Sequence, residues 1–195
     1  KLPEANVLRV NSSLKSLQLL VKFHRNQFQL PVIGITGSNG KTIIKEWLYQ
    51  FLTPDYKIVK NPGSYNSQLG VPLSVWQMQR YHQLGIFEAG ISHPDEMEVL
   101  ADIIRPTIGL LTNIGNLPVT DKASIENLIH CLVLMLELGL QPEIIQQKIS
   151  LLRPVPMRLE LKQGINNCQL IDDSYNNDLA GLQISFDFIN NIQKS

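Results

Sequence analysis

Apolar residues recur along the chain with two alternating spacings, and the alternation predicts an α/β fold. Short β-rich runs are expected to form strands, and runs with apolar residues three and four apart are expected to form helices. The predicted strands cover residues 32–36, 56–59, 84–87 and 107–112. The predicted helices cover residues 10–28, 43–52, 71–78, 94–104, 124–138 and 142–151. Strands that alternate with helices in such short units favour a mostly parallel sheet with helices on both faces.

The last part of the chain differs in character from the rest. Beyond Pro154 to Pro156, two strands are predicted at residues 157–162 and 168–171, followed by a helix from Asp178. We therefore expect three parts, which are residues 1–30 with the first helix, 31–156 with the parallel sheet, and 157–195 as the start of another domain. Ligands are expected at the carboxyl ends of the parallel strands.

Composition and charge argue against several classes of partner. The chain has 17 basic and 17 acidic residues and a formal net charge of zero, so no strong field attracts nucleic acid or an anionic membrane. No segment contains about 18 consecutive apolar residues, and the first residues lack the apolar stretch of a secretion signal. Cys131 and Cys168 lie in apolar runs without Cys-x-x-Cys spacing, which predicts buried thiols. We expect a cytoplasmic protein.

A glycine-containing loop lies between the first predicted strand and the next helix. It reads Thr36-Gly37-Ser38-Asn39-Gly40-Lys41-Thr42. The general nucleotide-loop pattern requires an earlier glycine at the position of Ile35, yet the two glycines present still let backbone N–H groups turn towards an anion. Lys41 would contact the β- and γ-phosphates of a nucleotide, and the Thr42 hydroxyl would bind Mg²⁺. The alternative is a tight turn with an incidental lysine.

An acidic residue, Glu88, ends the third predicted strand. A carboxylate at the end of a buried strand is costly unless it is paired or bound to a metal, so Glu88 is a candidate ligand of Mg²⁺. The alternative is a glutamate that caps a nearby loop. The small residues Ala89 and Gly90 after it permit a substrate to approach closely.

Two further polar segments could bind a substrate or could be ordinary loops. Residues 61–70 are rich in turn-forming residues, which is equally typical of a surface loop. Residues 172–178 follow a predicted strand, and their carboxylates could accept ribose hydroxyl groups or cap the following helix. The four histidines lack metal-ligand spacing, so we interpret them as structural or solvated residues.

These segments resemble, in the same order, the motifs of the Mur ligase family. The glycine loop resembles the ATP loop of that family, which also lacks the first glycine, and Lys45-Glu46 follow it. Further matching segments are Asn66 to Pro72, Glu88 to Gly90, Arg105 to Gly115, Asn127, Arg158 and Asp172 to Asn176. Ser67 departs from the pattern, because it replaces the second asparagine of the family's Asn-Asn pair.

The resemblance implies an ATP-dependent carboxylate–amine ligase that uses ATP and Mg²⁺. It implies catalytic roles for Lys41 and Glu88, and it makes Thr42 and Glu88 the metal ligands. The residues implied to bind the nucleotide are Thr36, Gly37, Ser38, Asn39, Gly40, Lys41, Thr42, Asn127, Arg158 and Asp173. The residues implied to bind the other substrates are Ser64, Asn66, Tyr175 and Asn176.

The resemblance also implies a substrate class. Within the family, the Tyr175-Asn176 form points to a ligase that joins D-alanyl-D-alanine to UDP-N-acetylmuramoyl-tripeptide through an acyl phosphate, during peptidoglycan precursor synthesis. The sequence as a whole is most similar to the bifunctional type, in which the ligase is fused to an alanine racemase. The resemblance implies a monomeric ligase module. Residues 1–30 would then be the end of the domain that holds the UDP-sugar, and residues 157–195 the start of the C-terminal ligase domain.

The chain departs from the family after Gly115. Family members carry there a histidine and a carbamylated lysine that bind a second metal, whereas here residues 116–120 lead directly into the next predicted helix. Three alternatives therefore stay open. They are a folylpolyglutamate-type ligase, a phosphotransferase or NTPase switch with the same loop, and a nucleotide-binding fragment without activity of its own.

Overall fold

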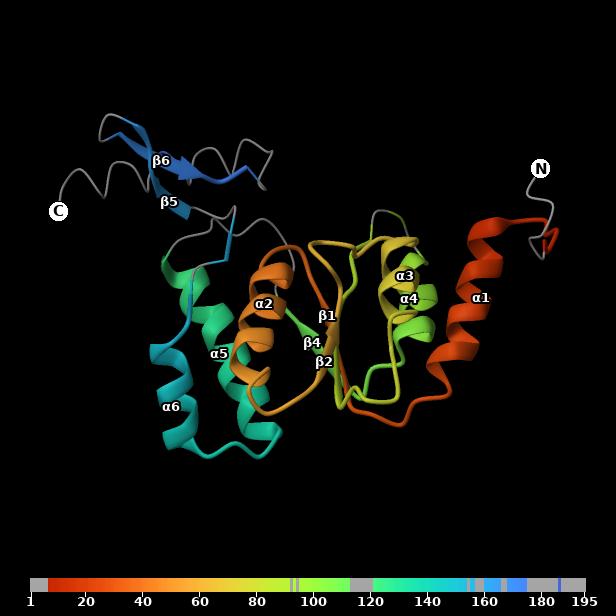
Figure 1. Ribbon diagram of the computed structural model, residues 1–195, viewed down its shortest axis with the longest axis horizontal. Coiled ribbons are helices and arrows are strands. Elements are labelled where there is room, and N and C mark those ends of the chain that lie inside the picture. Colours follow the sequence, from red (N-terminus) through yellow and green to blue (C-terminus); the bar gives the residue numbers. More distant parts are fainter. Residues whose placement is uncertain are drawn as a thin grey trace. The chain divides into compact units, whose positions relative to one another are not determined.

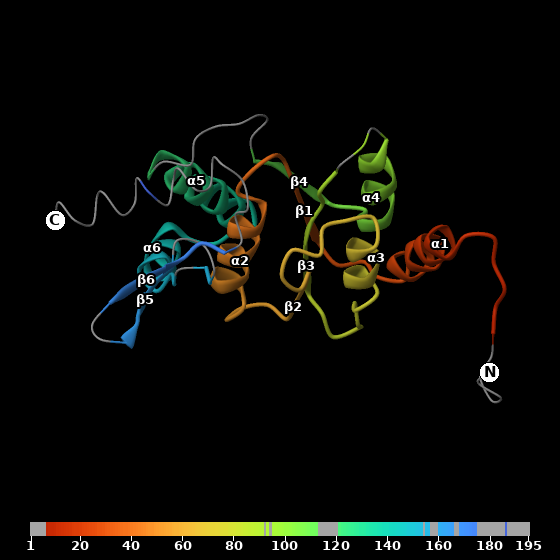
Figure 2. The ribbon, with the colours of Figure 1, turned by 90° about the horizontal axis from the view of Figure 1, so that it is seen from above.

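The computed structural model contains a four-stranded sheet with the order β2-β3-β1-β4, whose strands are labelled in Figures 1 and 2. Its strands are β1 (Val32–Thr36), β2 (Ile58–Lys60), β3 (Leu84–Glu88) and β4 (Ile108–Leu111). The central strand β3 pairs in parallel with both β1 and β2, with Ile35 opposite Glu88 and Lys60 opposite Ile86. The predicted parallel sheet is confirmed, and β1 has the predicted bounds because Pro31 and the glycine loop enclose it.

The structure describes residues 7–91, 93, 95–112, 121–153, 155–156, 160–165, 168–174 and 186. It divides into two compact parts. Unit 1 comprises Lys1–Thr36 and Tyr56–Gly109, and unit 2 comprises Gly37–Asp55 and Leu110–Ser195. The domain boundaries expected at residues 30 and 156 stay predictions.

Six helices accompany the strands in the described residues. They are α1 (Ser13–Arg25), α2 (Lys41–Leu52), α3 (Gly70–Val75), α4 (Glu96–Ile104), α5 (Asp121–Glu137) and α6 (Pro142–Ser150). Four bounds differ from the prediction by three residues. Helix α1 was predicted over residues 10–28, but it begins at Ser13, where Ser12 caps it, and ends at Arg25. Helix α3 ends at Val75, because the chain turns where Gln77 and Met78 donate to Ser74 and Val75. Helix α5 begins at Asp121, three residues before the predicted start.

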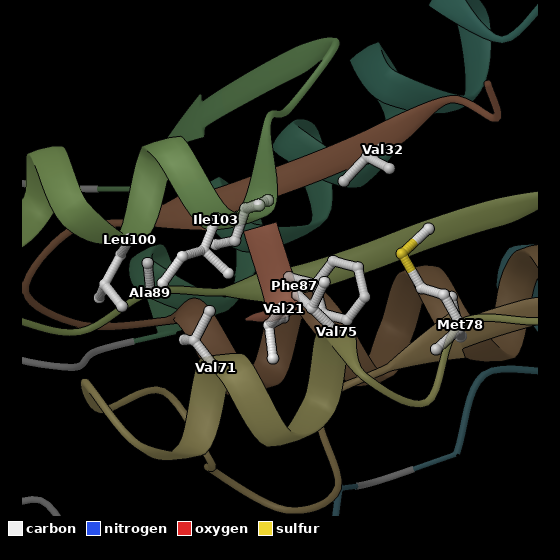
Figure 3. Packing of buried hydrophobic residues seen from close by; sticks show 11 residues of the cluster. Val21, Val32, Val71, Val75, Met78, Phe87, Ala89, Leu100 and Ile103 are labelled. Atoms are coloured by element: carbon white, nitrogen blue, oxygen red, sulfur yellow. The ribbon is translucent and has the colours of Figure 1, made fainter. Parts of the chain in front are cut away.

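The core of unit 1 lies where α3 and α4 pack on the sheet and α1 packs against these two helices (Figures 2 and 3). Its members are mostly aliphatic and come from all of these elements. They are Val21, Val32, Val59, Val71, Val75, Met78, Phe87, Ala89, Leu100, Ile103 and Ile104. Phe87 and Ala89 are both in this cluster, and alternate residues of a strand point to the same face. The side chain of Glu88, between them, therefore points to the other face of the sheet.

Polar side chains hold the amino end of the sheet together. The Thr107 hydroxyl accepts a hydrogen bond from the Val32 N–H (2.9 Å) and donates to the Val32 carbonyl (3.2 Å). The buried guanidinium of Arg25 donates to the carbonyls of Phe28, Ile104 and Arg105. Burial, and then the charge of Arg105, lower the pKa of Arg25. These bonds fix the end of α1 to the turn after α4.

Unit 2 contains α2, α5 and α6, which lie side by side in both ribbon views (Figures 1 and 2). The carboxyl end of α2 is tied to α6, because the Lys148 ammonium donates to the Phe51 carbonyl (2.7 Å) and forms an ion pair with Asp55 (2.6 Å). Gln50 also exchanges two hydrogen bonds with the backbone of Arg153. The helix that follows the glycine loop is thus anchored at its far end.

A two-stranded antiparallel sheet, β5 (Glu160–Gln163) and β6 (Gln169–Asp172), follows these helices. Cys168 precedes β6 and is exposed, so the prediction of two buried thiols is wrong for this residue. A sheet of two short strands offers no packed interior to cover it, whereas Cys131 is buried on α5. Within the described residues, no helix is both long and apolar enough to span a bilayer.

Candidate functional site

The glycine loop connects the carboxyl end of β1 to the first turn of α2. Gly37 has a φ of 127° and Gly40 a φ of 83°, both in the region that residues with a side chain rarely adopt. Gly40 is the N-cap of α2, and its carbonyl accepts the first helical hydrogen bond from Ile44 (2.9 Å). Both glycines of the motif are therefore required by the backbone.

The polar side chains at this loop are held by unit 2 itself. The Lys41 ammonium donates to the carbonyls of Gly37 (2.5 Å) and Ser38 (3.2 Å), so it lies over the loop. The Thr112 hydroxyl donates to the Asn39 carbonyl (2.5 Å) and ties the end of β4 to the loop. Thr42 is buried in the first turn of α2.

Asn127 of α5 lies against the end of the loop. A Cβ atom built on Gly40 would overlap the Asn127 carboxamide oxygen and would lie 3.2 Å from its Cγ. The structure therefore brings Asn127 next to Gly40 of the loop. Gly40 leaves room for this side chain, which is a second reason for a glycine there.

In unit 1, Glu88 ends β3 and is fully buried. The strand that it adjoins is β1, whose last residue, Thr36, is the first residue of the glycine loop. The Thr36 hydroxyl donates to the Ala89 carbonyl (3.1 Å), which joins the two strand ends. A buried carboxylate of this kind is stable only when it is paired, hydrogen-bonded or bound to a metal.

The predicted substrate loop lies beside Glu88 in unit 1. The Gly90 N–H donates to the Asn66 carbonyl (2.8 Å), and a Cβ on Gly90 would come within 3.0 to 3.3 Å of the Asn66 carboxamide. Ser64 belongs to the same turn, since its carbonyl accepts from the Asn66 N–H (2.7 Å). The structure thus brings Ser64 and Asn66 together with the end of β3.

The C-terminal candidates are only partly described. Asp173 follows β6, next to Asp172, whose carboxylate accepts from the backbone and hydroxyl of Ser174 and pairs with Lys162. These bonds, with that of Lys162 the strongest, lower the pKa of Asp172 to about 2. Arg158, Tyr175, Asn176 and residues 113–120 lie outside the described residues. Among the residues described, no group of three or more histidine, cysteine or acidic side chains is arranged so that it could hold a metal ion.

Sequence reasoning missed Asn61. It was grouped with the turn-forming residues of the polar loop, yet its side chain is fully buried and bonded to both Tyr65 and Glu88. The available signal was its position, two residues after the predicted strand and directly before Pro62. Asparagine there can replace a backbone partner that the chain no longer supplies.

The sequence was compared with protein families and with known proteins. The family model described as "Mur ligase middle domain" matches residues 35–134, slightly more than half of the chain. The chain belongs to the Mur ligase family. Two relatives of this Mur ligase chain are named UDP-N-acetylmuramoyl-tripeptide–D-alanyl-D-alanine ligase. The protein of Treponema pallidum is 38% identical over 112 residues, which cover 57% of this chain and 24% of the relative. That of Bacillus subtilis is 34% identical over 122 residues, which cover 63% and 27%.

Solved structures show the same Mur ligase fold. MurF from Acinetobacter baumannii superposes with a TM-score of 0.77 at 20% identity, and the match covers 93% of this chain and 59% of that one. MurF from Thermotoga maritima in complex with ADP gives a TM-score of 0.71 at 18% identity, with 96% and 63% covered. The chain thus spans about a quarter of the length of the curated relatives it matches.

Proposed function

We propose that this chain is the nucleotide-binding part of an ATP-dependent ligase that joins D-alanyl-D-alanine to UDP-N-acetylmuramoyl-tripeptide in peptidoglycan precursor synthesis. The proposal is supported by the family, by the names of the relatives at 33–40% identity, and by one local observation. That observation is a loop with two glycines at positive φ, which caps α2 and lies against Asn127. A cytoplasmic location and a monomeric ligase module belong to the same proposal.

The loop supplies what phosphate binding requires. The amino end of α2 carries positive partial charge and presents the backbone N–H groups of its first turn, both of which favour an anion. Lys41 adds a mobile point charge, which would leave the carbonyls of Gly37 and Ser38 to contact phosphate oxygens. The remaining residues proposed for the nucleotide are Thr36, Asn127, Arg158 and Asp173.

Mg²⁺ is the metal proposed for the ligase, with Thr42 and Glu88 as its ligands, as the family resemblance implies. Thr42 offers a hydroxyl and Glu88 a buried carboxylate, and oxygen atoms of these two kinds are typical magnesium ligands. When bound, Mg²⁺ and ATP supply charge neutralisation and an activated phosphoryl group for the substrate carboxylate. Lys41 would stabilise the negative charge that develops there. Ser64 and Asn66, with Tyr175 and Asn176, are proposed to contact the other substrates.

Binding and turnover test the proposal separately. Isothermal titration of the chain with ADP, with and without Mg²⁺, is expected to show binding that Mg²⁺ strengthens and that Lys41→Ala weakens. In the full-length protein, release of ADP from ATP is then followed with UDP-N-acetylmuramoyl-tripeptide and D-alanyl-D-alanine, and separately with a folate and glutamate. Turnover only with the folate pair, or turnover that needs no acceptor, would overturn the substrate class. Absence of nucleotide binding would overturn the whole proposal.

A further inference from the structure

The Asn61 carboxamide makes three hydrogen bonds in the interior of unit 1. Its Oδ1 accepts from the Glu88 N–H (2.7 Å), and its Nδ2 donates to the carbonyls of Glu88 (3.3 Å) and Tyr65 (2.6 Å). The orientation of the amide follows from these partners, because a backbone N–H only donates and a carbonyl only accepts. One side chain thus serves both backbone groups of Glu88 and one group of the loop.

These bonds extend the pairing of β2 with β3 beyond the end of β2. The last paired residue of β2 is Lys60, opposite Ile86. The backbone then leaves the sheet, because Pro62 begins a turn that the Tyr65 N–H closes (3.2 Å). The backbone groups of Glu88 would lose their partner strand at this point, and an unpaired buried N–H or carbonyl is costly. The Asn61 side chain replaces the missing strand at this position.

The third bond couples Glu88 to the loop of residues 62–66. Tyr65 is held by Asn61, and the next residue, Asn66, accepts the Gly90 N–H (2.8 Å). The loop is therefore attached to the end of β3 at two points. Tyr65 is linked through Asn61 to the backbone of Glu88, and Asn66 is linked to Gly90, two residues further on. A shift of the loop would pull on the backbone that carries the Glu88 carboxylate.

We propose that Asn61 is a positioning residue, which holds the magnesium ligand Glu88 and the substrate loop with Ser64 and Asn66 in one fixed arrangement. The inference rests on the proposed function in so far as it assigns a metal to Glu88. The coupling of the two segments is a property of the chain itself, and it can be measured without nucleotide or metal.

Hydrogen exchange followed by NMR tests the coupling directly. Asn61→Ala removes all three bonds, so the amides of Glu88 and Gly90 are both expected to exchange about tenfold faster or more. Asn61→Asp keeps the acceptor that faces the Glu88 N–H, but it replaces the donor by an oxygen that repels the carbonyls of Glu88 and Tyr65. The Glu88 amide should then stay protected while the Gly90 amide is released. An unchanged Gly90 amide in both variants would show that Asn61 does not hold the loop.

Metal binding tests the consequence for the site. The matched control is Thr107→Val, which removes a side chain that serves the N–H and carbonyl of Val32 at the opposite end of the sheet. Mg²⁺ should raise the affinity for ADP by a factor that is about tenfold smaller in Asn61→Ala than in the unaltered chain. The affinity for ADP without Mg²⁺ should be unchanged. Thr107→Val should lower thermal stability and leave both affinities unchanged.

The outcomes separate the two proposals. An equal loss of the Mg²⁺ effect in Thr107→Val, or no loss in Asn61→Ala, would overturn the positioning role. If the unaltered chain bound no Mg²⁺ and nucleotide at all, the proposed function would fail. The exchange rates of the Glu88 and Gly90 amides would still decide whether Asn61 couples the strand end to the loop.

Discussion

Replacement of Gly40 by alanine tests whether the glycine loop is shaped for a ligand. Two costs arise at this position. A residue with a Cβ at a φ of 83° costs about 1–2 kcal/mol, and the new methyl group would overlap the Asn127 carboxamide. Gly139 allows the first cost to be measured alone, because it has a φ of 82° and no atom within 4 Å of the built Cβ.

Thermal unfolding and titration with ADP and Mg²⁺ are the two assays. Gly139→Ala should lower the melting temperature by about 2–8 °C, which corresponds to 1–2 kcal/mol in a chain of this size, and should leave ADP binding unchanged. Gly40→Ala should lower it further and weaken ADP binding about 5- to 30-fold, since strain of 1–2 kcal/mol is relieved only by reshaping the loop. The double variant with Asn127→Ala should recover the additional loss of stability. The reasoning would be refuted if Gly40→Ala and Gly139→Ala behaved alike in both assays.

Three further predictions concern single side chains. In the full-length ligase, Lys41→Ala is expected to lower turnover, measured as ADP release, about 10²- to 10³-fold through loss of one preorganised charge, and near-normal turnover would contradict its role. Burial raises the pKa of the Cys131 thiol to about 12, so Ellman's reagent should titrate one thiol, that of Cys168, in the native chain and two after unfolding. The Asp172 carboxyl has a pKa lowered to about 2, so its contribution to stability is present above its ordinary pKa and is lost as the pH falls through about 2. Carboxyl NMR should find that midpoint, and Lys162→Ala should raise it.

The sequence predicted the elements of the sheet better than the contacts at its edge. Val32–Thr36 was predicted residue for residue, because a β-rich run stands between a proline and a glycine loop. The spacing of apolar residues also predicted every helix of the described residues. It could not predict where the helices end, because helix ends depend on local hydrogen bonds. The role of Asn61 could not be predicted, since its partners Tyr65 and Glu88 meet it only after the strands have paired. Cys168 was misjudged because an apolar run does not reveal how little structure covers it.

The strand order has a consequence for how the chain is made. During synthesis β1 and β2 emerge first, but they cannot pair with one another because β3 separates them in the finished sheet. The backbone of β1 gains its paired strand β3 only when residues 84–88 have left the ribosome. Until then the growing chain carries two unpaired strands, which are prone to aggregate. The same parallel arrangement that brings Glu88 beside β1 thus makes the nascent chain a candidate for chaperone protection.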